Sequence, residues 1–245
     1  MSKVIGIASE GPTDYLVLKT IIDRITGEEN RYLHLQPEVD MMGRYGNGWK
    51  GVWKWCKETV PLDVIMDNIQ PRIDIVVIQM DGDVVRKERE VHCLCASSVC
   101  DEKGKDFPLY CEKAIARMCP VDVPCQSHSH DIKDVINHGK QVLDETISAS
   151  DKSRIIITIP CDSTDAWIVA AYDDVEDIEK MEDPWRNIIA KRKYYHDVRV
   201  RGEKKSISTY NVFTEHLVDN WNLVTEKCYS AKLLEQEICR VFALV

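Results

Sequence analysis

Acidic residues follow three apolar segments of this sequence, and carboxylates in such positions can bind a metal ion. The acids are Glu10 with Asp14, then Asp81 with Asp83, then Asp162 with Asp165. If the three segments are parallel strands, their carboxyl ends meet at one edge of a sheet. Carboxylates gathered there raise one another's pKa unless a cation joins them. Mg²⁺ or Mn²⁺ suits such a site, because it prefers a few carboxylates with phosphate and water oxygens.

The spacing within two of these motifs supports the same chemistry, although each motif alone has a simpler explanation. Asp81 and Asp83 are two residues apart, so we expect both side chains on one face of a strand end, with Gly82 allowing the backbone to turn. Asp14 alone could cap or favour a helix start, and Asp81-Gly82-Asp83 alone could be a turn. Matched positions after successive strands favour the functional interpretation.

The elements that must position these acids follow from apolar runs and helical spacing. Strands are predicted within 3–9, 32–39, 72–84 and 153–161, and helices within 12–25, 48–60, 131–147 and 162–174. Buried strands alternating with helices indicate an α/β fold with a mostly parallel sheet flanked by helices. We predict a domain over 1–175, interrupted by a Cys-rich insertion at about 85–130, and a mainly helical C-terminal region over 176–245 packed on it.

These motifs resemble those of the Toprim domain, the Rossmann-like fold shared by topoisomerases, primases and OLD-type nucleases. That family has a Glu after its first strand, often as Glu-Gly-x-x-Asp, and an Asp-x-Asp after its third. Here Glu10-Gly11-Pro12-Thr13-Asp14 and Asp81-Gly82-Asp83 match. The segment "IPCDSTDAWIVAA" is also similar to small Toprim-like proteins of bacterial defence, with Asp165 where Glu is usual.

The resemblance implies a metal-dependent nuclease that cuts DNA or RNA, for example tRNA. Asp81 and Asp83 would hold Mg²⁺ or Mn²⁺, and Glu10 would act as general acid or base or bind a second metal. Asp14 would bind or orient a ligand, and Asp165 would be a further catalytic acid. Lys204 or Lys205 could reach the site and stabilise the transition state of in-line attack.

A basic segment offers a candidate surface for nucleic acid. Residues 186–205 contain eight Lys or Arg and two acids. Backbone phosphates would bind Lys191, Arg192, Lys193, Lys204 and Lys205. Tyr194, Tyr195 or Tyr210 could stack on bases. The alternative is a solvated helix and loop.

The Cys-rich insertion raises the question of a structural zinc ion. Candidate ligands are Cys93, Cys95, Cys119, Cys125 and His128. Zinc takes four such ligands in a tetrahedral array. The sequence contains no clean C-x₂-C pair here, so buried free thiols are the alternative.

Composition limits the classes of protein to consider. The 245 residues are 44% apolar and 30% charged, as in ordinary globular proteins, and no apolar run is long enough to cross a bilayer. The start lacks the layout of a signal peptide, so we expect a cytoplasmic protein that does not enter a membrane. The net charge of −9 argues against a uniformly basic coat but not against a local basic groove.

Three further expectations concern function and partners. No phosphate-binding loop of the G-x-x-x-x-G-K-[ST] type is present, so by the resemblance a separate ATPase could control the nuclease in phage defence. A homodimer is a further possibility. Two rival functions keep the fold: a non-catalytic protein-binding module, and a phosphatase or phosphotransferase with Asp81 as nucleophile.

Overall fold

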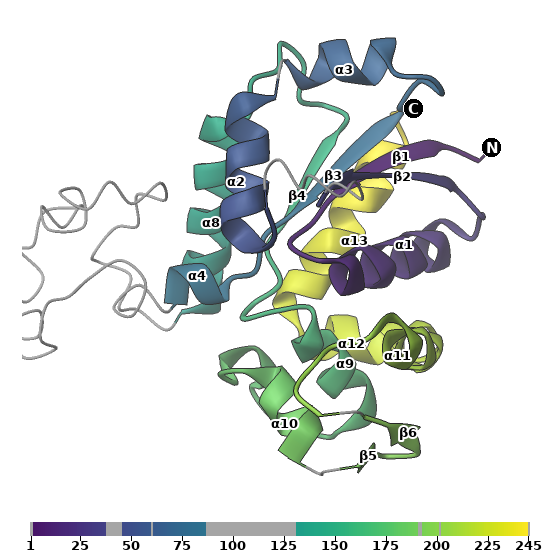
Figure 1. Ribbon diagram of the computed structural model, residues 1–245, viewed down its shortest axis with the longest axis vertical. Coiled ribbons are helices and arrows are strands. Elements are labelled where there is room, and N and C mark those ends of the chain that lie inside the picture. The colour runs from purple at the N-terminus through teal and green to yellow at the C-terminus, as the bar shows by residue number, and fades with distance from the viewer. Residues whose placement is uncertain are drawn as a thin grey trace, which may run out of the picture.

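The computed structural model describes residues 2–37, 46–59, 61–86, 131–190, 193–200 and 202–244. These residues form an α/β fold whose four-stranded sheet is entirely parallel, compatible with a Rossmann-like arrangement (Figure 1). The strands are β1 (Val4–Ala8), β2 (Arg31–Gln36), β3 (Ile75–Gln79) and β4 (Ile155–Thr158). Their order in the sheet is β2-β1-β3-β4, so the direction of winding reverses between β1 and β3. Open parallel sheets bind ligands at such a switch point.

Successive side chains of the strands point to opposite faces of the sheet and pack into two hydrophobic layers, one on each face. Ile5 and Ile7 of β1 and Val77 of β3 belong to one core cluster. Val76 and Ile78 of β3 belong to the other. Because both faces are buried, β1, β3 and β4 are nearly continuous apolar runs, as the sequence predicted, whereas the edge strand β2 is more polar and only partly buried.

Helices cover both faces of the sheet (Figure 1). One layer contains α2 (Gly48–Glu58), α3 (Leu62–Asn68) and α8 (Ile132–Thr146). The other contains α1 (Pro12–Thr26), α11 (Ile207–Asp219), α12 (Trp221–Lys227) and α13 (Tyr229–Phe242). Apart from α3, these helices lie in segments that the sequence predicted to be helical, so those predictions are confirmed. Those of the C-terminal region share one core with β1 and β3.

The start of α1 is set by the residues that follow β1. Pro12 occupies the first helical turn, where its missing N–H has no intrahelical partner to lose. Gly27 ends the helix with a φ of 66°, a left-handed conformation that glycine adopts without strain. The buried face of α1 includes Val17, Leu18 and Ile21, and also Asp14 in its first turn. A carboxylate is therefore held inside the protein beside the end of β1.

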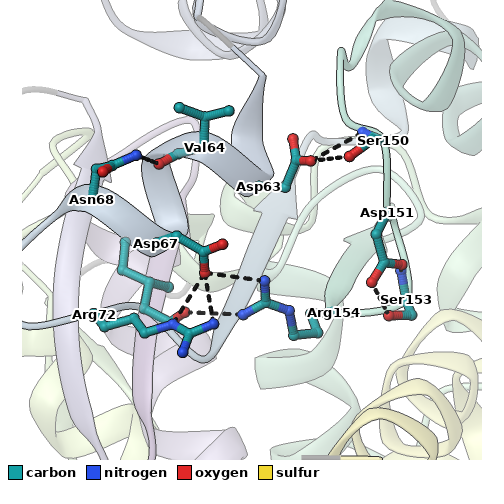
Figure 2. A network of polar contacts seen from close by, with 10 residues as sticks. Asp63, Val64, Asp67, Asn68, Arg72, Ser150, Asp151, Ser153 and Arg154 are labelled. Carbon is teal, nitrogen blue, oxygen red and sulfur yellow. Dashed lines mark hydrogen bonds and ion pairs between the residues drawn. The ribbon is translucent and has the colours of Figure 1, made fainter.

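The amino edge of the sheet carries a separate polar network, shown in Figure 2. Asp67 of α3 pairs with Arg72 at 2.8 Å and with Arg154, just before β4, at 3.5 Å. Asp63 accepts hydrogen bonds from the hydroxyl and backbone N–H of Ser150. These contacts join α3 to the chain entering β3 and β4. They are partly exposed and lie at the edge opposite to the candidate acids, so we read them as structural.

Smaller elements complete the fold beside the carboxyl edge. They are α4 (Asp83–Arg86), α9 (Asp165–Tyr172), the 3₁₀ helix η3 (Ile178–Lys180), α10 (Pro184–Ala190), and the antiparallel pair β5 (Tyr194–Tyr195) and β6 (Val198–Arg199). In Figure 1, α9, α10 and the β5–β6 hairpin lie at the end of the molecule opposite to α3. Trp167 of α9 is fully buried in the core cluster that contains α1 and the C-terminal helices.

Several sequence predictions need correction or fall outside the described residues. Helix α3 and the β5–β6 hairpin were not predicted. Strand β3 ends at Gln79 and Asp83 begins a helix, so the prediction that Asp81 and Asp83 share one face of a strand end is wrong. The Cys-rich insertion lies within 87–130, outside the described residues. Among the helices that the structure describes, none is long and apolar enough to cross a membrane.

Gly82 is required by close packing between the segments that follow β3 and β4. Its N–H donates to the Pro160 carbonyl oxygen at 2.8 Å, and a Cβ at this position would lie 2.9 Å from that oxygen. We expect Gly82→Ala to lower the free energy of unfolding by about 1–3 kcal/mol, because backbone atoms must move apart. Urea denaturation measures this. Val64→Ala, at an exposed position of α3, should change it by less than about 0.5 kcal/mol. Equal effects of the two variants would contradict the packing argument.

Candidate active site

Glu10 and Asp81 are joined across the switch point of the sheet. Glu10 follows β1 and Asp81 follows β3, which are neighbouring strands. The Asp81 backbone N–H donates to Glu10 Oε1 at 2.7 Å. Among the described residues, no hydrogen bond is formed by Glu10 Oε2 or by Asp81 Oδ2. Each acid therefore has one carboxylate oxygen without a hydrogen bond to the described part of the chain.

Gln79, the last residue of β3, fixes this pair of acids. Its side chain is fully buried, and its Oε1 accepts from the Glu10 backbone N–H at 3.0 Å. This contact orients the amide, so that Nε2 donates to Asp81 Oδ1 at 2.6 Å. One side chain thus links the backbone after β1 to the carboxylate after β3.

Asp14 brings a third carboxylate from α1. It is buried, and its Oδ1 accepts from the Thr164 hydroxyl at 2.6 Å. Thr164 immediately precedes α9, after β4. The hydrogen bond therefore connects the element after β1 with the element after β4.

Asp83 is placed by the same loops. It begins α4, is half-buried, and its backbone N–H donates to the Asp162 carbonyl oxygen at 3.1 Å. Its charge contributes to the raised pKa of Glu10. Asp83 therefore lies within electrostatic reach of the Glu10–Asp81 pair.

An ion pair between Lys205 and Asp165 brings a positive charge to the site. Asp165 is the first residue of α9 and is 0% exposed. The Lys205 ammonium lies 2.6 Å from its Oδ2. Lys205 comes from the segment just before α11, so the ion pair joins the C-terminal region to the sheet's carboxyl edge.

Burial and repulsion raise the pKa values of the acids. Burial, opposed by the hydrogen bond from Asp81 and reinforced by Asp83 and Asp14, raises the pKa of Glu10 to about 8. The pKa of Asp81 is raised well above its usual value by burial, then by Glu10 and Asp14. Burial is also the main reason that the pKa of Asp14 is raised. The site holds more negative charge than its surroundings stabilise.

Lys205 supplies part of the missing positive charge. Burial disfavours its ammonium, but the carboxylates of Asp165, Asp14 and Asp81 outweigh this effect and raise the pKa of Lys205. In return, the Lys205 charge lowers the pKa values of Glu10, Asp14 and Asp81 relative to burial alone. Lys205 is therefore within electrostatic range of the whole acid cluster.

The donor chemistry of this cluster fits a hard divalent cation. Carboxylate oxygens are the preferred ligands of Mg²⁺ and Mn²⁺. Among the described residues, no three His, Cys, Asp or Glu side chains are already grouped as a metal-binding cluster. Glu10, Asp81 and Asp83 are the residues that could hold the ion.

The structure brings together the acids that the sequence analysis selected, and Lys205 with them. Lys193 and Lys204 are exposed, as a phosphate-binding role requires. Tyr195 and Tyr210 are fully buried, so the suggestion that either could stack on bases is wrong. Side chains of the candidate phosphate ligands Lys191 and Arg192 lie outside the described residues. So do the candidate zinc ligands Cys93, Cys95, Cys119, Cys125 and His128.

Sequence reasoning missed two residues that orient the acids, Gln79 and Thr164. Only Gln79 left a signal, since it is a polar residue inside the apolar run 75–80. A buried polar side chain needs a hydrogen-bonding partner, so this position could have been flagged.

Comparison of the chain with protein-family models, with curated proteins and with solved structures gives no match. The likeness to Toprim domains therefore rests on the motif residues, and the function must be argued from the site itself.

The raised pKa of Glu10 predicts a pH dependence of stability. Between the ordinary value of 4.5 and about 8, folded Glu10 binds more proton than unfolded Glu10. The free energy of unfolding therefore falls as pH rises through this window. Glu10→Gln keeps an oxygen to accept from the Asp81 N–H but removes the charge. We expect the free energy of unfolding of this variant minus that of wild type to increase by about 1 kcal/mol or more between pH 5 and pH 8. Urea titrations across this range measure it, and parallel curves would contradict the assignment.

Proposed function

We propose that this protein is a metal-dependent nuclease that hydrolyses phosphodiester bonds of DNA or RNA. The observation that carries the proposal is the clustering of Glu10, Asp14, Asp81 and Asp83 with the Lys205 ammonium at the switch point of a parallel sheet. Excess carboxylate suits a divalent cation, and a cation together with an ammonium suits a phosphate group.

The residues divide the work of hydrolysis between them. Asp81 and Asp83, with Glu10, would hold Mg²⁺ or Mn²⁺, which when bound supplies Lewis acidity for attack by water on phosphorus. Where it does not bind the metal ion, Glu10 would instead act as general acid or base. Lys205 would stabilise the negative charge that develops on the phosphate oxygens. Gln79 and Thr164 keep the carboxylates oriented.

The β5–β6 hairpin offers a surface for the substrate strand. Tyr195 and Val198 point into the core, whereas their neighbours Tyr194 and Arg199 form an exposed cross-strand pair. Tyr194 is 54% exposed. An exposed ring next to a guanidinium can stack on a base and bind a phosphate. Lys193 and Lys204 flank this surface in the chain.

Control by a partner ATPase is part of the proposal and rests on the resemblance alone. A nuclease that is not controlled would damage its host. Activity that appears only when the partner is added would support such control, and full activity of the single chain would argue against it.

Cleavage of labelled plasmid DNA and total tRNA with Mg²⁺ or Mn²⁺ tests the nuclease directly. We expect Glu10→Gln and Asp81→Asn to lower the cleavage rate by about 100-fold or more, because each removes a metal-site oxygen or the general base. Mn²⁺ should also raise the melting temperature of wild type by mass action, and this shift should shrink in both variants.

Asp67→Asn is the matched control for these variants. It removes an acid of the same kind from the opposite edge of the sheet (Figure 2). It should leave cleavage and the Mn²⁺-induced shift unchanged. A wild-type protein that neither cuts nor responds to Mn²⁺ would favour the protein-binding module. Cleavage that survives in Glu10→Gln would reject the assigned site.

The hairpin surface makes a prediction about salt dependence. Each phosphate contact adds about 0.9 to the slope of log K against log salt for duplex DNA. Replacing both Lys193 and Lys204 by Ala should therefore reduce the magnitude of this slope by about 2. Fluorescence anisotropy of a labelled oligonucleotide measures it. The double variant Lys152→Ala, Lys232→Ala is the control and should keep the wild-type slope. An unchanged slope for the first pair would remove this surface from the substrate path.

A further inference from the structure

Both oxygens of Asp165 are occupied by side chains of this protein. Tyr210 donates its hydroxyl to Oδ1. Oδ2 accepts from the Ser163 hydroxyl at 3.3 Å and pairs with the Lys205 ammonium at 2.6 Å. Because Asp165 and Tyr210 are both fully buried, water does not compete for the hydrogen bond between them. Glu10 and Asp81 differ, since each keeps one carboxylate oxygen without a bond to the described residues.

Trp185 of α10 holds the segment that carries Lys205. Its indole N–H donates to the Glu203 carbonyl oxygen at 2.9 Å, two residues before Lys205. Its ring stacks on Tyr210, with 5.8 Å between ring centroids and 27° between planes. The Lys205 ammonium lies 5.9 Å from the centre of the Trp185 ring, a distance at which the cation is attracted to the ring face.

The start of α11 fixes the spacing between Lys205 and Tyr210. Ser206 caps the helix, and its hydroxyl accepts from the Thr209 N–H. Tyr210 then lies in the first turn of α11, directed at Asp165. Lys205 and Tyr210 therefore approach the same carboxylate from one short piece of chain.

We propose that Asp165, Tyr210 and Trp185 are positioning residues that hold Lys205 as the resident cation of the site, and that Asp165 does not bind the metal ion. Tyr210, Ser163 and Lys205 already take about three of the four lone-pair sites of Asp165, so this carboxylate has less to offer a metal ion than Glu10 or Asp81. Its own buried charge, in turn, is balanced by the Lys205 ammonium. The inference that these residues position Lys205 rests on the geometry alone. The inference that Lys205 then acts in phosphodiester cleavage rests on the proposed function.

Chemical labelling of lysine tests the positioning without any cleavage. Acetylation by an N-hydroxysuccinimide ester requires a free, unprotonated amine. Digestion after glutamate releases residues 204–215, a peptide that contains both Lys204 and Lys205. Lys204 is exposed and serves as internal reference, whereas the Lys205 side chain is 34% exposed and paired. Mass spectrometry should show Lys205 of wild type labelled several-fold more slowly than Lys204.

Variants of the three positioning residues should release Lys205. Asp165→Asn removes the charge, and Tyr210→Phe removes one hydroxyl with little change in shape. Trp185→Phe removes the indole donor. The ratio of Lys205 to Lys204 labelling should rise by about tenfold for each unit by which the pKa of Lys205 falls. The largest rise is expected for Asp165→Asn. If that variant fails to fold, Tyr210→Phe still decides the question.

Mn²⁺ binding, followed by electron paramagnetic resonance, tests the second half of the proposal. We expect Asp165→Asn and Tyr210→Phe to bind Mn²⁺ within about threefold of wild type, because neither removes a ligand. Cleavage should fall in both, mainly in kcat. A loss of Mn²⁺ affinity in Asp165→Asn that exceeds the roughly 10–100-fold cost of residues that only support the ligands, and that is as large as the loss in Asp81→Asn, would overturn the proposal and make Asp165 a ligand.

The outcomes separate this inference from the proposed function. Equal labelling of Lys205 and Lys204 in wild type, or labelling unaffected by Asp165→Asn and Tyr210→Phe, would overturn the positioning even if the protein cuts nucleic acid. Slow labelling of Lys205 in a protein that neither binds Mn²⁺ nor cuts would support the positioning and reject the nuclease.

Discussion

The ion pair between Lys205 and Asp165 brings positive charge to the place where this fold collects acids. Glu10, Asp14 and Asp81 lie within range of one another's charge, and burial makes each carboxylate costly. Lys205 opposes that cost from a segment far along the chain. Breaking this pair would leave the charge of the fully buried Asp165 uncompensated. The C-terminal region is thus tied electrostatically to the sheet as well as through a shared core.

The parallel sheet explains why the acids gather at all. Every strand points the same way, so whatever follows β1, β3 and β4 arrives at one edge. The two apolar layers hold the strands in register and leave that edge to polar residues. Gln79 then uses the neighbouring positions of β1 and β3 to bond a backbone N–H on one side and a carboxylate on the other. The geometry of the site follows from strand pairing before any ligand is considered.

The sequence predicted the sheet and the acids at its edge, because both depend on local pattern. An apolar run bounded by polar residues marks a buried strand, and Glu10 and Asp81 are found directly after such runs. Contacts between distant segments leave no such pattern. Tyr210 meets Asp165 from 45 residues away, and its position in α11 resembles any buried aromatic residue. The wrong prediction that Asp81 and Asp83 share one face of a strand has a different cause. The predicted strand ran to residue 84, whereas β3 ends at Gln79 and the four-residue helix α4 begins at Asp83.

The residue type at position 165 bears on how the site divides its charges. The segment resembles one in which a glutamate stands before Ala-Trp, and this chain has the shorter aspartate. Asp165 lies at the buried start of α9, where Tyr210, Ser163 and Lys205 reach it. A side chain longer by one methylene would carry the carboxylate away from these partners, or force them to move in a packed interior. An aspartate is thus the acid that suits a buried anchor for lysine, while Glu10 and Asp81 each have one carboxylate oxygen without a hydrogen bond to the described residues.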